Sequence, residues 1–437
     1  MTPPSRRRIV VLDDDPTGTQ GVAGLPIVLR PDADTLGEAT EGWDGPLWVL
    51  TNTRAMNEAD AVRTLRGIVR AVVASVDLSV AGPVEFVLRG DSTLRGHVIA
   101  EFDALASDDD VFLFVPAFLE AGRVTVDGIH FAEVAGQRVE VADTEYAQDH
   151  EFGYRSSRLT EWVAEHDSGR VTIAVAHERL RAADGVAALR DALLSAPAGA
   201  IVLPDAETAE DLDVIAAAWN GALDAGRGVV LRCAASLAGV ITESPARAID
   251  LPPANGPVLV VCGSYTAGAR DQLAALDAAH GPTRVLVDIT EARAGRQRAA
   301  AHARSLTAAL DSALSRERVV VLSTPRSTIA EHLTLEAGEA IMDAVIAAVA
   351  GLGVRPGLVI SKGGITGARV ARDGFAAATA MVLGQPAPGV PVWQLELPDG
   401  ARLTQVVVPG NVGSPTLIAE LVTRATGQPP TAAVALP

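Results

Sequence analysis

The chain has 437 residues, a length that allows two or three domains, each with a core of its own. Hydrophobic residues make up 48% and aromatic residues 4%, which favours a folded α/β protein over a disordered one. The formal net charge of −18 disfavours nucleic acid or an anionic membrane surface as the main partner. No apolar run approaches the roughly 18 residues of a membrane-spanning helix, and the run after the basic N-terminus is too short for a signal peptide. We therefore expect a cytoplasmic protein.

The first half of the chain alternates short β-branched runs with amphipathic segments. Strands are predicted at 8–12, 25–29, 46–50, 84–88, 111–115, 171–175, 200–204 and 228–232. Between the third and fourth of these runs, Val62, Leu65, Val69 and Val72 recur at helical spacing and predict a helix. This alternation predicts a largely parallel sheet with polar side chains at the carboxyl ends of its strands. After residue 115, a glycine-containing loop between two extended pieces predicts a β-hairpin.

A proline-rich stretch without periodicity, residues 243–257, is typical of an interdomain linker. We therefore expect an N-terminal domain at 1–245 and a C-terminal domain at 256–425. In the second domain, strands are predicted at 258–262, 284–288, 318–322 and 357–361, with helices at 265–280, 294–314 and 331–350. Two further runs flank an Asp-Gly turn and predict an antiparallel hairpin, 392–397 with 402–408. The two cysteines, Cys233 and Cys262, are expected to be buried small side chains rather than a disulfide or a zinc site.

Three consecutive aspartates, Asp13 to Asp15, follow the first predicted strand and precede a Pro-Thr-Gly-Thr turn. The Asp13-x-Asp15-x-Thr17 spacing resembles the nucleophile loop of haloacid dehalogenase-type phosphatases, with Asp13 as nucleophile and Asp15 as acid. Gly18 stands where that loop carries a hydrophobic residue, and the acidic run 108–110 precedes a strand instead of following one. The same aspartates could instead bind substrate hydroxyls or a cation, and the aspartates alone do not decide between these hypotheses.

A second polar motif, "RGDSTLRGH", follows the strand at 84–88. Two arginines flanking a carboxylate and two hydroxyls can clamp a small acid while the aspartate accepts a proton from a substrate hydroxyl. The residues concerned are Arg89, Asp91, Ser92, Thr93 and Arg95. A helix N-cap at Asp91 or Ser92 is the structural alternative, and both hypotheses can hold together. In the next glycine-containing loop, Arg123 could bind a carboxylate or a phosphate, although that loop could also be purely structural.

Three loops rich in small residues follow predicted strands of the second domain. They carry Ser264 with Thr266, Lys362 with Gly363, Gly364 and Thr366, and Gly410 with Asn411 and Gly413. Such loops can bind phosphates through backbone amides, although neither a Walker A nor a G-x-G-x-x-G motif is present. Lys362 is the one lysine of the chain, which reflects either arginine-biased codon usage or a need for a compact ammonium at phosphate. The pattern predicts a kinase with substrate in the first domain, nucleotide in the second and a cleft between them.

Six motifs in order, spread over almost the whole chain, resemble the four-carbon acid sugar kinase family, once catalogued as a domain of unknown function. They are "LDDDPTGTQ", "RGDSTLRGH", "PAFLEAGRVTVDG", "GSYTAGARDQ", "KGGITG" and "PGNVGS". The resemblance implies two α/β domains, an N-terminal one for substrate and a C-terminal one for nucleotide. It also implies phosphorylation, with ATP and Mg²⁺, of small acid sugars such as threonate, erythronate or 3-oxo-tetronate. The inserted Asp15-Pro16 departs from the family's D-D-L-T-G, and "PGNVG" departs from S-G-N-F-G.

The resemblance also implies site residues. Asp14, Thr17 and Gly18 match the first substrate turn, and Asp91, Ser92, Thr93 and Arg95 match the second motif. For ATP, the matching residues are Ser264, Gly363, Gly364, Ile365, Thr366 and Gly410, to which the residues themselves add Lys362 and Asn411. No metal ligands are identified, and a homodimer is compatible with the pattern.

The mechanism that we expect is in-line transfer of the ATP γ-phosphoryl group to a substrate hydroxyl, with closure of the domains excluding water. Arg89, Arg95 or Arg123 would bind the substrate carboxylate. Asp91 would be the general base, with Asp14 as the competing candidate. A sugar-acid sensor without catalysis, built on the same scaffold, is the remaining alternative.

Overall fold

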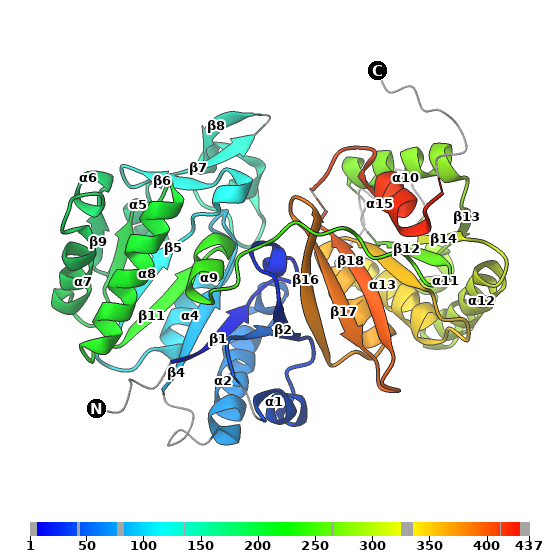
Figure 1. Cartoon of the computed structure of the whole chain (residues 1–437), viewed down its shortest axis with the longest axis horizontal. Helices are drawn as coiled ribbons and strands as arrows, with labels where there is room; N and C mark the ends of the chain where they lie inside the picture. The colour runs from blue at the N-terminus through cyan, green and yellow to red at the C-terminus, as the bar shows by residue number, and fades with distance from the viewer. Residues whose placement is uncertain are drawn as a thin grey trace. The chain divides into compact units, whose positions relative to one another are not determined.

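The computed structural model describes residues 7–41, 44–76, 83–134, 136–263, 266–324, 335–410 and 412–428. The chain divides into two compact units between Ala246 and Arg247, and each unit is an α/β domain (Figure 1). Within the described parts of the chain, no helix combines the length and the apolarity that crossing a membrane requires. Cys233 and Cys262 are buried free thiols, as predicted.

The N-terminal unit is built on a parallel sheet with the strand order β2-β3-β1-β4-β11-β5-β10-β9. The bounds are β1 Arg8–Asp13, β2 Leu25–Val28, β3 Leu47–Leu50, β4 Val84–Arg89, β5 Val111–Val115, β9 Thr172–Val175, β10 Ile201–Pro204 and β11 Val229–Cys233. All the strands predicted from the sequence of this half are confirmed. β-branched runs buried on both faces are what a parallel sheet between helices requires.

Helices cover the sheet of this unit. They are α1 Ala33–Thr40, α2 Glu58–Ser75, α4 Val98–Leu105, α5 Leu159–His166, α6 His177–Leu180, α7 Gly185–Ser195, α8 Ala209–Asp224 and α9 Ala235–Ile241. Alternate strand residues such as Val10 and Leu12 form one core with α1, α2, α4 and α5, because every second side chain lies on the same face. Helices α8 and α9 pack against β11, and Figure 1 shows them in front of the strands.

Helix α2 confirms the helix predicted from the apolar spacing, but its buried face is rotated slightly from the predicted one. Leu65 and Val72 are buried as expected, together with Ile68, whereas Val62 and Val69 are only half-buried. The helix begins after Asn57, whose side chain accepts a hydrogen bond from Asp60 N.

A small antiparallel sheet of β6 Val124–Val126, β7 Ile129–Val134 and β8 Gln137–Glu140 confirms the predicted hairpin and adds a third strand. Asp127 and Gly128 form the two-residue turn between β6 and β7, with φ of 53° and 72°. Positive φ at both positions matches the twist of the strands, and Gly and Asp tolerate it better than most residues.

The C-terminal unit has the strand order β13-β14-β12-β15-β18-β17-β16, parallel from β13 to β18 and antiparallel beyond. The bounds are β12 Val258–Cys262, β13 Thr283–Leu286, β14 Val319–Ser323, β15 Leu358–Lys362, β16 Thr379–Ala387, β17 Val390–Glu396 and β18 Arg402–Val408. The predicted parallel strands and the β17-β18 hairpin are confirmed. Strand β16 was not predicted.

Helices α10 Ala267–His280, α12 Arg296–Leu314 and α13 Leu335–Ala350 confirm the predicted helices, of which residues 265 and 331–334 lie outside the described residues. The unit also contains the helices α11 Ile289–Ala292, α14 Gly364–Arg369 and α15 Leu417–Thr426. Helices α10 and α15 share a core with β12, β15 and β18. The proline-rich residues 243–257 form no helix or strand. The cleft predicted between the domains stays a prediction.

Candidate active site

The carboxyl ends of neighbouring strands meet at one edge of the N-terminal sheet. Asp13 at the end of β1 pairs in register with Leu50 of β3 and Arg89 of β4, and Arg89 pairs with Cys233 of β11. The loops that follow these strands therefore begin side by side, which is where open α/β sheets bind ligands. The ends of β1 and β4 and the loops that follow them carry most of the residues that were predicted to bind substrate.

Asp13 is a buried structural acid. Its side chain is fully buried, its Oδ1 accepts a hydrogen bond from Arg89 Nη1 at 3.0 Å, and its Oδ2 accepts one from Trp48 Nε1 at 2.7 Å. Burial raises the pKa of Asp13 to about 6, although the Arg89 charge works in the opposite direction. A carboxylate enclosed in this way has no free path to a phosphoester. The geometry therefore does not favour the phosphatase hypothesis.

The turn after β1 lies directly on Asp13. A Cβ added to Gly18 would be 1.8 Å from Asp13 Oδ2, so the turn can approach the carboxylate only with glycine at this position. Thr17 donates its amide, at 2.6 Å, and its hydroxyl to Asp15 Oδ1. The turn is thus held from within by Asp13 and Asp15, and Gly18 has a structural role whether or not it also touches substrate.

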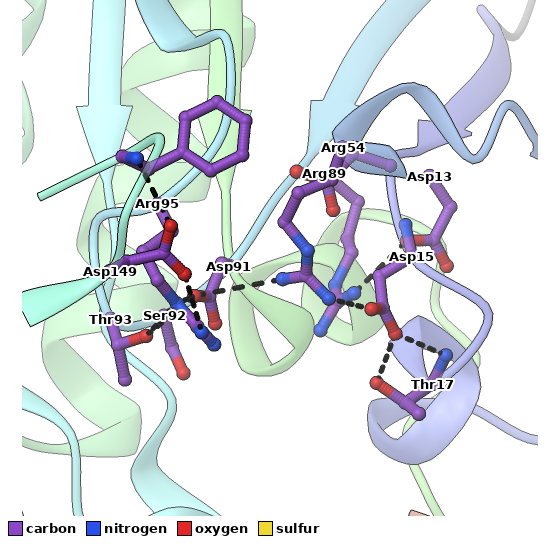
Figure 2. Close-up of polar contacts among 12 residues, drawn as sticks. Asp13, Asp15, Thr17, Arg54, Arg89, Asp91, Ser92, Thr93, Arg95 and Asp149 are labelled. Carbon is purple, nitrogen blue, oxygen red and sulfur yellow. Dashed lines mark hydrogen bonds and ion pairs between the residues drawn. The ribbon is translucent and has the colours of Figure 1, made fainter. Parts of the chain in front are cut away.

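Arg54, from the loop after β3, connects the two polar motifs (Figure 2). Its guanidinium forms an ion pair with Asp15 Oδ2 and lies 3.6 Å from Asp91 Oδ2. The sequence analysis did not select this residue. The polar run "TNTR", directly after a predicted strand, could have indicated a site residue there.

Asp91 accepts hydrogen bonds from two neighbours in its own loop. Its Oδ2 lies 2.5 Å from Thr93 Oγ1 and 2.7 Å from Arg95 Nε (Figure 2). Burial alone would raise the pKa of Asp91, but Arg54, Arg95 and the Thr93 hydrogen bond outweigh burial and hold that pKa well below its usual range. Asp91 is therefore a firmly ionised anchor for two arginines and a weak proton acceptor.

The backbone of this loop is held by His130 of β7 and by Tyr154. His130 Nε2 lies 2.8 Å from Ser92 O, and Tyr154 donates its hydroxyl to Thr93 O at 2.8 Å. Because a carbonyl only accepts, His130 must carry its proton on Nε2. Burial lowers the pKa of His130 to about 4, so the ring is neutral near pH 7. The N-cap hypothesis is wrong, because α4 begins after His97, which makes no side-chain capping bond.

Asp14 has a different environment from its neighbours. Its Oδ2 accepts a hydrogen bond from Arg232 Nη2 at 3.0 Å, whereas its Oδ1 is buried and has no hydrogen-bond partner among the described residues. Arg232, from β11, also forms an ion pair with Glu101 of α4. A Cβ on Gly90 would lie 2.3 Å from Arg232 Nη2, so the glycine that precedes Asp91 makes room for this arginine. Neither Arg232 nor Glu101 was selected from the sequence.

Two partly exposed arginines flank the ring of Tyr146. The guanidinium carbons of Arg95 and Arg123 lie 5.2 and 6.0 Å from the ring centroid, and Arg95 Nη1 is 3.4 Å from Asp149 Oδ2. Arg123 Nε is buried without a hydrogen-bond partner among the described residues. Of the three arginines predicted to bind a substrate carboxylate, Arg89 instead lies buried against Asp13, and Arg95 and Arg123 remain accessible.

The strand ends of the C-terminal unit bring its loops together in the same way. Cys262 of β12 pairs in register with Lys362 of β15, which in turn pairs with Val408 of β18. A Cβ on Gly263 would lie 2.7 Å from Thr366 Oγ1, so the first two loops are in close contact. Ser264 and Asn411, both predicted to bind nucleotide, lie outside the described residues.

Of the other residues that were predicted to bind nucleotide, some are buried in the protein and others lie at its surface. Gly363 has a φ of 107°, which favours glycine, and Gly364 begins α14. Ile365 is 51% exposed. Lys362 is fully buried, and burial lowers its pKa to about 8. Its Nζ donates to Pro409 O at 2.7 Å and to Val412 O at 3.3 Å, so the ammonium is bound to protein carbonyls.

Comparison with known proteins agrees with this two-part arrangement. Residues 9–241 match the model of a sugar-binding N-terminal domain family, and residues 259–418 match that of a nucleotide-binding C-terminal domain family. The chain belongs to the four-carbon acid sugar kinase family. Within this family, it is 31% identical over 252 residues to a D-erythronate kinase of Heliobacterium modesticaldum, which is 55% of this chain and 52% of that protein. The match thus spans about half the length of the curated relative.

Two crystal structures share the fold of this family member. One is a protein described as a tRNA synthase of Salmonella typhimurium LT2, with a TM-score of 0.69 and 18% identity, covering 96% of this chain and 98% of that one. The other is the Haemophilus influenzae protein HI1011, with a TM-score of 0.64 and 16% identity, covering 95% and 99%. At this identity, the likeness supports the fold alone.

Proposed function

We propose that the protein is a kinase that transfers the γ-phosphoryl group of ATP to a hydroxyl of a small acid sugar, a four-carbon aldonate or oxo-tetronate. The order of a sugar-binding and a nucleotide-binding domain in one chain supports this reaction, as does the D-erythronate kinase among its relatives. The observation that carries the proposal is Asp14, whose buried Oδ1 lacks a partner among the described residues at the strand ends of the sugar-binding unit.

Arg95 and Arg123 are the proposed ligands of the substrate carboxylate. Both are accessible, both lie against Tyr146, and Arg123 Nε has no hydrogen-bond partner within the described residues. Arginine binds a carboxylate through two parallel N–H donors, which fixes the orientation of a short acid sugar. The loops after β1 and β4 are held by hydrogen bonds of Thr17, Ser92 and Thr93.

Asp14 is the proposed general base, in preference to Asp91. A base must have a free oxygen within reach of the substrate hydroxyl and must hold the proton that it accepts. The Oδ1 of Asp14 is free of protein donors in the described structure, and Arg232 fixes the other oxygen. Asp91 binds its proton too weakly for this role, because Arg54 and Arg95 hold its pKa down. We assign to Asp91 the orientation of those two arginines.

The three loops after β12, β15 and β18 are the proposed binding site for ATP. Small residues and backbone amides at strand ends suit phosphate groups. The described residues contain no group of three or more His, Cys, Asp or Glu side chains that could hold a metal ion. The proposal therefore has Mg²⁺ enter as part of the MgATP substrate, since Mg²⁺ is commonly bound by phosphates and only one or two protein carboxylates.

A coupled assay tests the proposal. The purified chain is incubated with MgATP and each of a panel of threonates, erythronates, oxo-tetronates and longer acid sugars, and ADP formation is followed. We expect ADP formation that depends on one or a few four-carbon acids. If an acid binds but no member of the panel leads to ADP formation, the result would support the sensor instead. Phosphate release from phosphomonoesters would support the phosphatase.

A further inference from the structure

The ring of Tyr146 lies beside two arginines that come from different loops. The guanidinium carbon of Arg95 is 5.2 Å from the ring centroid, and that of Arg123 is 6.0 Å from it. Both distances lie within the range over which the face of an aromatic ring attracts a cation. Tyr146 belongs to a one-turn helix, η5 Glu145–Gln148, and the sequence analysis did not select it.

The ring attracts these cations without occupying all of their hydrogen-bond donors. A guanidinium carries five N–H donors, and an aromatic face acts on its charge, whereas a carboxylate partner would take up donors directly. Arg123 Nε is buried and has no hydrogen-bond partner among the described residues. Arginines held by a ring can therefore keep their positions and still bind an anion.

The segment that carries Tyr146 is anchored in the N-terminal unit. The next residue, Ala147, lies in the hydrophobic core that this unit shares with α1, α2, α4 and α5. Asp149 Oδ1 accepts hydrogen bonds from two backbone amides of the following turn, at 3.0 and 3.1 Å. Its Oδ2 lies 3.4 Å from Arg95 Nη1 (Figure 2). The ring of Tyr146 and the carboxylate of Asp149 thus approach Arg95 from one anchored segment.

We propose that Tyr146 is a positioning residue, whose ring holds Arg95 and Arg123 in place for the carboxylate of the acid sugar. The inference rests on the proposed binding of that carboxylate by these two arginines. An arginine side chain has many rotamers, and ordering it when a ligand binds costs free energy. A ring that restricts both guanidiniums before the acid arrives lowers this cost. Tyr146 therefore acts on the affinity for the acid and not on the phosphoryl transfer.

Steady-state kinetics of full-length variants test this role, with the four-carbon acid that gives most ADP in the coupled assay as the probe. Tyr146→Leu removes the ring, and Tyr146→Phe keeps it. We expect Tyr146→Leu to raise KM for the acid about tenfold, because two cation–π contacts are lost, and to change kcat and KM for MgATP less than about threefold. In Tyr146→Phe, KM for the acid should stay within about threefold of the wild-type value.

Phe131→Leu is the matched control, because Phe131 of β7 also lies beside an arginine. The guanidinium carbon of Arg138 is 5.8 Å from the centroid of the Phe131 ring. Arg138 forms an ion pair with Glu207 and has no part in the proposed substrate site. We expect KM for the acid to change less than about twofold in Phe131→Leu, since this cation–π contact is of the same kind but holds no proposed ligand.

The outcomes separate the positioning role from the proposed function. If KM for the acid is no higher in Tyr146→Leu than in Phe131→Leu, the positioning role is wrong while the kinase stands. An equal rise in Tyr146→Leu and Tyr146→Phe also overturns it, because the hydroxyl and not the ring would then be responsible. A wild-type chain that forms no ADP with any acid overturns the proposed function together with this inference. Should Tyr146→Leu fail to fold, Tyr146→Met, which also lacks a ring, takes its place with the same expectations.

Discussion

The guanidinium of Arg232 is almost fully buried between two carboxylates, those of Asp14 and Glu101. Each of the three side chains is at most 2% exposed, so none can exchange its partner for water. Taking charges into the interior costs free energy that their mutual attraction must offset. The same arginine donates to Asp14 Oδ2, while the buried Asp14 Oδ1 has no hydrogen-bond partner among the described residues. In the proposed mechanism, both the charge balance and the orientation of the base therefore depend on Arg232.

Replacement of Arg232 by methionine is therefore expected to lower the free energy of unfolding by about 3–5 kcal/mol, because it leaves two buried carboxylates without a counter-charge. Urea unfolding of wild type and Arg232→Met measures the change. Arg355→Met is the control, since Arg355 pairs with Asp399 at an exposed position where ion pairs contribute about 0–1 kcal/mol. Equal losses in the two variants would show that the buried network does not stabilise the domain.

The ionisation of Asp13 makes the free energy of unfolding depend on pH. Its pKa is about 6 in the folded chain against an ordinary value of 3.8, so the folded state binds this proton more tightly than the unfolded state. The stabilisation is complete below about pH 4 and is lost as the pH rises through about 6. The difference between the two pKa values corresponds to about 3 kcal/mol.

Asp13→Asn removes this titration. We expect the free energy of unfolding of wild type, relative to that of Asp13→Asn, to fall by about 2 kcal/mol between pH 4 and pH 7. Urea unfolding at four or five pH values provides the comparison. Two curves that remain parallel across this range would contradict the assignment of a raised pKa to Asp13.

At the scale of elements, the turn after β1 lies directly against Asp13 and carries the first motif that is proposed to bind substrate. We expect Gly18→Ala to destabilise the chain by more than about 2 kcal/mol and to reduce affinity for the acid sugar, because the new methyl group would overlap the Asp13 carboxylate. Gly37→Ala is the control, since nothing lies within 4 Å of a Cβ there and alanine favours the α1 helix. Melting temperatures that fall equally in both variants would argue against the contact.

Strands with continuous β-branched runs were predicted correctly, because such runs are the signal of a sheet buried on both faces. Strand β16 gave no such signal. It carries Gly384 and Pro386, and its pairing with β17 shifts register near Gly384. Strand β8 is short and mostly exposed, so its sequence lacks an apolar pattern. Irregular and exposed strands depend on their neighbours more than on their own residues.

The candidate site was predictable where it follows strand ends and not where it depends on distant contacts. Asp14 and Asp91 stand in local motifs, and their loops are adjacent as the parallel sheet requires. Arg232 lies 218 positions from Asp14, and only the strand order brings the two together. A single cation inside the apolar run "VVLRC" was a usable signal, because a charge in a buried strand needs a partner.

For the whole molecule, the order of the polar motifs identified the two domains and their expected ligands. Acids and arginines gather in the first half of the chain and small-residue loops in the second, and the two family matches fall on these same halves. Because the net charge of −18 repels anions, an anionic ligand must be bound by hydrogen-bond donors or cations within its own site. In the proposed function, Arg95 and Arg123 are such donors in the first unit, and backbone amides are such donors in the second.

The choice of base is the central claim about the reaction, and steady-state kinetics of Asp14→Asn against Asp91→Asn tests it most directly. With the acid sugar that gives ADP in the coupled assay, we expect Asp14→Asn to lower kcat by about a hundredfold or more, with affinity for the acid largely kept. Asp91→Asn should mainly raise KM for the acid, because Arg54 and Arg95 lose their anchor. A wild-type kcat in Asp14→Asn, or loss of turnover confined to Asp91→Asn, would contradict the account.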